Sequence, residues 1–193
     1  MLNSKPAKRG VMMMADNKVD GTFHMSFKTK RMKFGVYPMK DGKVDSSRKL
    51  MAYSYALYTL KNSPLQWNGS KLINLNGEIG TSIGFSIVDD LKKMGVRVYE
   101  NSSLNGQMGM LSLGRIAAVV NIESLGDYAL RSYPQKFKDI IKIKPLFKTK
   151  DYYLMLSHKF VQEKSELAKN IWNEIKRIRE TGEYAKIAEK YSD

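Results

Sequence analysis

The segment from Leu75 to Glu123 constrains the fold of this chain more than any other part. Strand-like runs are expected at 79–83, 96–101 and 115–123, and helical patterns separate them. Ser86 is expected to cap the first helix with its side chain, and Asp89 places negative charge near the positive end of the helix dipole. Strands joined in this way by helices pair in parallel and form a doubly wound sheet. The segment therefore predicts an α/β domain that binds ligands beyond the carboxyl ends of its strands.

The segments on either side predict further strands and helices. Strands are expected at 19–27 and 50–61, two extended pieces separated by a basic turn within 140–160, and helices at 5–17, 104–113, from Ser165 to Gly182 and from Glu183 onward. The helix from Ser165 is amphipathic, because Leu167, Ile171, Ile175 and Ile178 recur at helical spacing. We expect it to pack on a core that includes Trp172.

Composition excludes several classes of protein. The chain has 42% hydrophobic and 27% charged residues, which is typical of a globular protein. It has no cysteine and only 2 histidines, so neither a metal centre nor another cofactor is expected. No apolar run reaches the roughly 20 residues that a transmembrane helix needs. The apolar run from Val11 to Ala15 is too short for a signal peptide.

The net charge of +14 raises the hypothesis of nucleic-acid binding, since phosphate neutralisation is a common use of a basic surface. The excess positive charge lies in residues 1–50 and 141–193, and the charge between them is nearly balanced. The sequence contains no run of five basic residues and no zinc-finger, RRM or KH signature. Lysines scattered over solvated faces explain the composition more simply, so nucleic acid is not an expected partner.

The stretch VDGTFHMSFKTKRMKFGVYP, residues 19–38, carries a candidate binding motif. Ser26 stands near the end of the expected strand, and Arg31 follows five residues later. A guanidinium can hold a carboxylate with two parallel hydrogen bonds, and a hydroxyl adds a further donor. The pair therefore indicates either a carboxylate-binding site or a lysine-rich surface edge.

Five stretches give the chain a resemblance to a known family. They are DGTFHMSFKTKRMKF, LNGEIGTSIGFSIVDDLKKMG, LSLGRIAAVVNIESLGDYAL, DYYLMLSHKF and IRETGEYAKIAEKY, and they occur in the same order as their counterparts in family 3 extracellular solute-binding proteins. These are the polar amino-acid-binding components of bacterial ABC importers. The resemblance implies a periplasmic protein without enzymatic activity, with a small-molecule ligand and an ABC permease as partners.

The resemblance also implies the architecture. It predicts an α/β, two-lobed periplasmic-binding-protein-like (type II) fold in which two strands cross between the lobes and the ligand is trapped in the cleft. Residues 1–60 would form part of lobe 1 with the first crossing strand, 61–146 lobe 2, and 147–193 the second crossing strand and the return to lobe 1. The family's opening strand–helix–strand has no counterpart here, so an incomplete first lobe is expected. The exposed sheet edge would then favour a homodimer.

The resemblance assigns roles to particular residues. Ser26 and Arg31 would hold the ligand carboxylate, and Phe85 and Ser86 would offer donors at the start of a helix. His24 should share the strand face of Ser26, because alternate residues point the same way. The acidic residue that holds the ligand ammonium in the family is replaced by Ile122. The expected ligand-binding residues are Ser26, Arg31, Phe85, Ser86, His24, Asn121 and Glu123.

Two alternatives remain beside a solute-binding protein. A truncated, non-binding, sensory or enzymatic relative would share the scaffold, and His24 and Glu123 are the candidate acid or base of an enzyme. The other alternative is the basic nucleic-acid-binding protein. The missing acidic residue also leaves the ligand open between an amino acid and a related carboxylate, since an unpaired ammonium is costly to bury.

Overall fold

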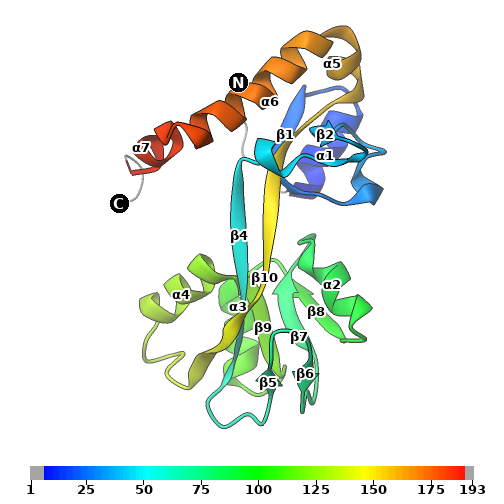
Figure 1. Ribbon diagram of the computed structural model, residues 1–193. Helices are drawn as coiled ribbons and strands as arrows, with labels where there is room; N and C mark the ends of the chain where they lie inside the picture. Colours follow the sequence, from blue (N-terminus) through cyan, green and yellow to red (C-terminus); the bar gives the residue numbers. More distant parts are fainter. Residues whose placement is uncertain (1–6, 190–193) are drawn as a thin grey trace. The chain divides into compact units, whose positions relative to one another are not determined.

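The computed structural model describes residues 7–189 and divides the chain into two compact units. Unit 1 contains the described parts of 1–52 and 151–193, and unit 2 contains residues 53–150. The chain passes from one unit to the other through β4 (Met51–Leu60) and returns through β10 (Ile140–Leu156), which are neighbouring strands (Figure 1). The lobe boundary expected between residues 60 and 61 falls at the end of β4. The lobe boundary expected between residues 146 and 147 falls within β10.

Unit 2 contains the doubly wound sheet that the sequence predicts. Its elements are β7 (Ile79–Ser82), α2 (Ile87–Lys93), β8 (Val98–Asn101), α3 (Leu104–Ser112), β9 (Ala118–Ile122) and α4 (Glu123–Ser132). The central strand β7 pairs in parallel with β8 on one side and with β9 on the other. β4 extends the sheet as an antiparallel neighbour of β9, and β5 (Gln66–Trp67) forms a separate hairpin with β6 (Leu72–Ile73). The prediction of strand, helix, strand, helix and strand is confirmed.

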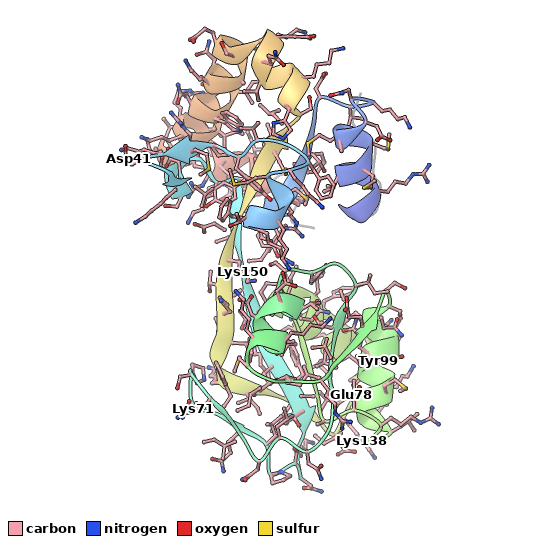
Figure 2. The ribbon with its side chains drawn as sticks, turned by 90° about the vertical axis from the view of Figure 1, so that its right-hand side faces the viewer. Asp41, Lys71, Glu78, Tyr99, Lys138 and Lys150 are labelled. Atoms are coloured by element: carbon pink, nitrogen blue, oxygen red, sulfur yellow. The ribbon has the colours of Figure 1, made fainter. Side chains whose placement is uncertain are left out.

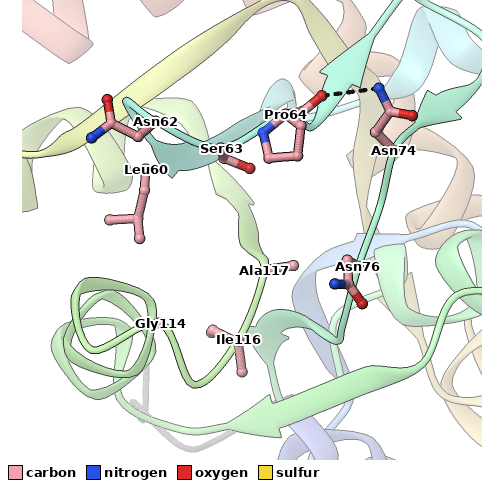
Figure 3. Close-up of a pocket in the computed structure, with 9 residues that line it drawn as sticks. All are labelled: Leu60, Asn62, Ser63, Pro64, Asn74, Asn76, Gly114, Ile116 and Ala117. Carbon is pink, nitrogen blue, oxygen red and sulfur yellow. Dashed lines mark hydrogen bonds between the residues drawn. The ribbon is translucent and has the colours of Figure 1, made fainter.

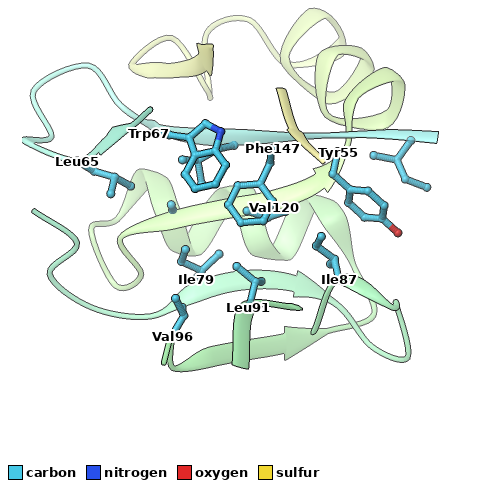
Figure 4. Packing of buried hydrophobic residues seen from close by; sticks show 12 residues of the cluster. Tyr55, Leu65, Trp67, Ile79, Ile87, Leu91, Val96, Val120 and Phe147 are labelled. Atoms are coloured by element: carbon cyan, nitrogen blue, oxygen red, sulfur yellow. The ribbon is translucent and has the colours of Figure 1, made fainter. Parts of the chain in front are cut away.

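Hydrophobic residues cover both faces of this sheet. On one face, Ile87 and Leu91 of α2 pack on a cluster that includes Ile79 and Val120 (Figure 4). On the other face, Met108 and Leu111 of α3 pack on Val119. Neighbouring residues of a strand point to opposite faces, which is why Val119 and Val120 belong to different clusters. Each fully buried side chain of this size contributes about 1.5–3 kcal/mol.

Unit 1 contains the first residues of β4, the last residues of β10 and several helices and short strands. These helices and short strands are α1 (Ala7–Ala15), β1 (Gly21–Ser26), η1 (Thr29–Arg31), β2 (Met39–Lys40), β3 (Lys43–Val44), η2 (Ser46–Arg48), α5 (His158–Glu163), α6 (Ser165–Glu180) and α7 (Glu183–Glu189). β1 pairs antiparallel with β10, and Ser26 lies opposite Tyr152. α6 buries Trp172, which donates from Nε1 to the carbonyl of Leu154 at 3.0 Å. The core position expected for Trp172 is confirmed.

The prediction of two extended pieces within 140–160 was wrong. β10 runs without interruption from Ile140 to Leu156. The basic residues lie on this strand and not in a turn, and Lys148 and Lys150 both make ion pairs with Asp90. Residues 5–6 of the first predicted helix and 190–193 of the last lie outside the described residues.

Among residues 7–189, no helix is both long and apolar enough to cross a bilayer. Within the same range, no group of three or more His, Cys, Asp or Glu side chains is arranged to hold a metal ion.

Candidate functional site

In unit 1, Ser26 and Arg31 contact each other through hydrogen bonds. Nη1 of Arg31 donates to the carbonyl oxygen of Ser26 at 2.7 Å and to its Oγ at 3.1 Å. The hydroxyl of Tyr37, which is fully buried, donates to the same carbonyl at 2.9 Å. Burial raises the pKa of Tyr37, and the charge of Arg31 offsets part of this effect. The η1 turn brings the guanidinium back onto the end of β1, where Ser26 holds it with two hydrogen bonds.

His24 does not share the environment of Ser26, so the expected alternation along this strand was wrong. The pairing of β1 with β10 changes register between Thr22 and Met25, and His24 adopts a positive φ of 59°. Such an irregularity inserts a residue into one strand and changes the face of those that follow. His24 is exposed, with its ring edge-on to Phe23, whereas Ser26 is 3% exposed.

In unit 2, Ser86 does not cap α2 with its side chain, and the predicted cap was wrong. Ser86 has helical backbone angles and makes no side-chain cap hydrogen bond. Its Oγ instead accepts from Nζ of Lys150, a residue labelled in Figure 2, at 3.0 Å, and Lys150 also pairs with Asp90. Burial tends to raise the pKa of Asp90, but hydrogen bonds from Lys150 and Lys148 outweigh it and lower the pKa.

Phe85 lies in the turn between β7 and α2. Its backbone N–H donates to the carbonyl of Ser82 at 3.2 Å, and its carbonyl accepts from Val88 at 3.3 Å. Its ring is half-buried and lies edge-on to Tyr55. Phe85 and Ser86 are thus neighbours at the carboxyl end of β7, where a doubly wound sheet binds its ligands.

Asn121 is buried in a polar network at the same ends of the strands. Its Nδ2 donates to Oγ of Ser82 at 3.0 Å and to Oε1 of Gln107 at 3.1 Å. Gln107 in turn donates from Nε2 to Oγ of Ser82 at 3.3 Å. Asn121 and Gln107 are 1% and 0% exposed, whereas Ser82 is only half-buried. Ser82 is therefore the member of this network that has access to solvent.

Glu123 takes part in a different cluster. Lys142 of β10 donates to Glu123 at 2.8 Å and to Asp127 at 2.7 Å. The hydroxyl of Tyr58 donates to Oδ1 of Asp127 at 2.9 Å and to the carbonyl of Glu123 at 3.0 Å. Hydrogen bonds to Asp127 and then Glu123 raise the pKa of Lys142, so it is a cation at neutral pH. The carboxylate of Glu123 thus has a partner within unit 2.

The predicted residues therefore fall into separate groups. Ser26 and Arg31 contact each other in unit 1, whereas Phe85, Ser86 and Asn121 lie around the carboxyl end of β7 in unit 2. Sequence reasoning did not find Ser82, Gln107, Lys142 or Lys150. Ser82 is separated from Gln107 by 25 residues and from Asn121 by 39, so no local motif joins them. The only signal for Ser82 was its place near the carboxyl end of the strand expected at 79–83.

A pocket of about 270 Å³ lies at the opposite, amino-terminal ends of β7 and β9 (Figure 3). It is lined by Leu60, Asn62, Ser63, Pro64, Asn74, Asn76, Gly114, Ile116 and Ala117. None of the predicted binding residues lies in it. Its lining has no charged side chain to hold a carboxylate, so we do not place the candidate site there.

The doubly wound sheet and the two strands that carry the chain between the units define an α/β protein with a periplasmic-binding-protein-like fold. No family model matches the sequence, and no curated protein matches it. Solved structures do match.

An ancestral arginine-binding protein bound to arginine is 20% identical, with a TM-score of 0.72 over 98% of this chain and 79% of that chain. The GluR0 ligand-binding core in complex with L-glutamate is 16% identical, with a TM-score of 0.73 over 100% of this chain and 80% of that chain. A histidine kinase sensor domain with similarity to periplasmic binding proteins is 13% identical, with a TM-score of 0.71 over 96% and 75%. At such identities the likeness shows the fold alone.

Proposed function

We propose that this protein is a solute-binding protein that captures a small carboxylate-bearing ligand, an amino acid or a related acid. The observation that carries the proposal is the orientation of Arg31, whose guanidinium is fixed by two hydrogen bonds to Ser26. A guanidinium that is already oriented loses less side-chain entropy when a ligand binds. A serine hydroxyl that accepts from Arg31 can also donate to a carboxylate oxygen. The fold supports the proposal, since two of its structural neighbours, the ancestral arginine-binding protein and the GluR0 ligand-binding core, were solved with the amino acids arginine and L-glutamate bound.

The test is a thermal-shift panel of amino acids and small organic acids on three proteins: the wild type, Arg31→Ala and Arg179→Ala. Arg179 is a matched control, because it also lies in unit 1 and donates to a serine carbonyl, that of Ser47 at 3.4 Å. Both variants remove one positive charge. A ligand at about a hundredfold its Kd stabilises the folded state by roughly 2.7 kcal/mol. We expect the ligand to raise the melting temperature of the wild type and of Arg179→Ala but not that of Arg31→Ala.

Two results contradict the proposal. One is the absence of any shift across the panel, and the other is a shift that persists in Arg31→Ala when circular dichroism shows that variant to be folded.

The proposal includes a periplasmic location, delivery of the ligand to an ABC permease and the absence of catalysis. It also includes self-association through β1, which is at one edge of the sheet order. Light scattering on the purified chain tests the last point, and a monomer at all concentrations contradicts it. A sensory role on the same fold is the second candidate, because one structural neighbour is a sensor domain. A chimaera in which this chain replaces such a domain would test it.

A further inference from the structure

The hydrogen bonds around Ser82 determine the direction in which its hydroxyl group can act. Two amide groups approach Oγ of Ser82: Nε2 of Gln107 at 3.3 Å and Nδ2 of Asn121 at 3.0 Å. A serine oxygen has two lone pairs and one hydrogen. If both approaching groups are N–H donors, both lone pairs are used and only the hydrogen remains.

Backbone groups establish that both are donors. Nε2 of Gln107 also lies 2.9 Å from the carbonyl oxygen of Asn101, and only the nitrogen end of an amide can make that bond. Oδ1 of Asn121 accepts from the backbone N–H of Ile122 at 2.8 Å, which assigns its other atom as the nitrogen. The remaining bond, from Nδ2 of Asn121 to Oε1 of Gln107 at 3.1 Å, agrees with both assignments. Neither amide can be turned over without placing like atoms against each other.

The hydroxyl hydrogen of Ser82 therefore needs an acceptor outside this network. Among residues 7–189, no side chain or carbonyl accepts a hydrogen bond from Oγ of Ser82. Ser82 is the last residue of β7 and is half-buried, while its two amide partners are fully buried. The network thus holds a serine rigidly at the carboxyl end of a central parallel strand and directs its O–H outward.

The surroundings favour an acceptor over an ammonium group as the partner of this hydroxyl. Ser86, four residues further on, already accepts from Lys150. Glu123, the carboxylate among the predicted binding residues, is paired with Lys142. A ligand ammonium placed against Ser82 would meet an oxygen whose lone pairs are both occupied.

We propose that Ser82 is a ligand-binding residue whose hydroxyl donates to an acceptor group of the ligand, such as a carboxylate or carbonyl oxygen. The inference deepens the proposed function and rests on it, since it requires that a small ligand binds. Asn121 and Gln107 are positioning residues, because they orient Ser82 and do not themselves touch the ligand. This role for Asn121 differs from the direct ligand contact that the sequence predicts.

The test compares two probes that share one carboxylate and differ at the other end: glutarate, which ends in a second carboxylate, and δ-aminovalerate, which ends in an ammonium group. L-Glutamate and L-arginine complete the set. Affinities are measured by isothermal titration calorimetry for the wild type, Ser82→Ala, Ser82→Thr and Ser124→Ala. Ser124 is an exposed serine of α4 and serves as the control. Because Ser82→Ala deprives two buried N–H groups of an acceptor, circular dichroism checks its folding; Ser82→Thr keeps the hydroxyl.

We expect glutarate to bind more tightly than δ-aminovalerate. Ser82→Ala should weaken glutarate binding about tenfold, the effect of one hydrogen bond to a charged acceptor. The affinities of Ser82→Thr and Ser124→Ala for glutarate should stay within about twofold of the wild-type value. Only Ser82→Ala should reduce the difference in affinity between glutarate and δ-aminovalerate.

Three results overturn the inference. Ligand binding that is lost in Arg31→Ala but unchanged in Ser82→Ala refutes the role of Ser82 and leaves the proposed function standing. Binding of δ-aminovalerate as tight as that of glutarate refutes the preference for an acceptor. If none of the four probes binds to the wild type, both the proposed function for these ligands and the inference fail.

Discussion

Replacing a glycine by alanine should change the stability of the protein in opposite directions at two helical positions of unit 2. Gly126 lies in α4 and Gly109 in α3. A methyl group at Gly109 would meet nothing within 4 Å, whereas one at Gly126 would lie 2.3 Å from Cζ and Oη of Tyr58. Tyr58 is fully buried and its hydroxyl is bonded to Asp127 and to the carbonyl of Glu123, so its ring has little freedom to move away.

The magnitude follows from these contacts. Alanine is favoured over glycine inside a helix by about 0.5–1 kcal/mol, so Gly109→Ala should stabilise the protein by up to that amount. Gly126→Ala gains the same preference but overpacks the core, which costs about 1–3 kcal/mol. It also displaces the hydroxyl of Tyr58, whose single hydrogen is shared between Asp127 and the carbonyl of Glu123, and a hydrogen bond contributes about 1 kcal/mol. The expected net effect of Gly126→Ala is a destabilisation of about 1–3 kcal/mol.

Urea unfolding followed by far-UV circular dichroism measures both changes in the same unit of the protein. The double variant Tyr58→Leu with Gly126→Ala supplies a further check, since removing the ring removes the clash. Its unfolding free energy should exceed the value expected from adding the two single effects. The reasoning is refuted if Gly126→Ala and Gly109→Ala change stability in the same direction, or if the double variant is simply additive.

Three further outcomes follow from single side chains. Thr81 is fully buried, and its Oγ1 has no hydrogen-bond partner among the described residues. Thr81→Val should therefore raise the unfolding free energy by about 1 kcal/mol. A loss of stability in this variant would contradict the prediction. Tyr37→Phe removes a buried donor to Ser26 and should lower the unfolding free energy by about 1 kcal/mol in urea titrations; no change would show that the bond contributes nothing. The pKa of Asp90 is lowered in the folded state, so its contribution is present above its unfolded pKa of 3.8 and is lost as pH falls through the folded value. Wild-type protein should therefore lose more stability between pH 7 and pH 3 than Asp90→Asn, and equal losses would exclude this role.

Features that depend on neighbouring residues could be predicted from the sequence. The alternation of apolar strands with helices over 79–123 predicts a parallel sheet, because each element shows its own period and a helix between two strands returns the chain to the same end of the sheet. The amphipathic helix from Ser165 and the core position of Trp172 follow from helical spacing in the same way. Ser26 and Arg31 are only five residues apart, so one turn of helix is enough to join them.

Contacts between distant residues were decided by the tertiary structure alone. Ser86 has the sequence context of a helix cap, yet its hydroxyl accepts from Lys150, which is 64 residues away. Glu123 is a plausible ligand carboxylate in the sequence, yet β10 brings Lys142 against it. Ser82 carries no motif, and only the packing of α3 and β9 around it determines which way its hydroxyl points. The physical reason is that a buried polar group must bond to whichever donor or acceptor the fold places about 3 Å away. That neighbour is set by packing and not by the order of the residues.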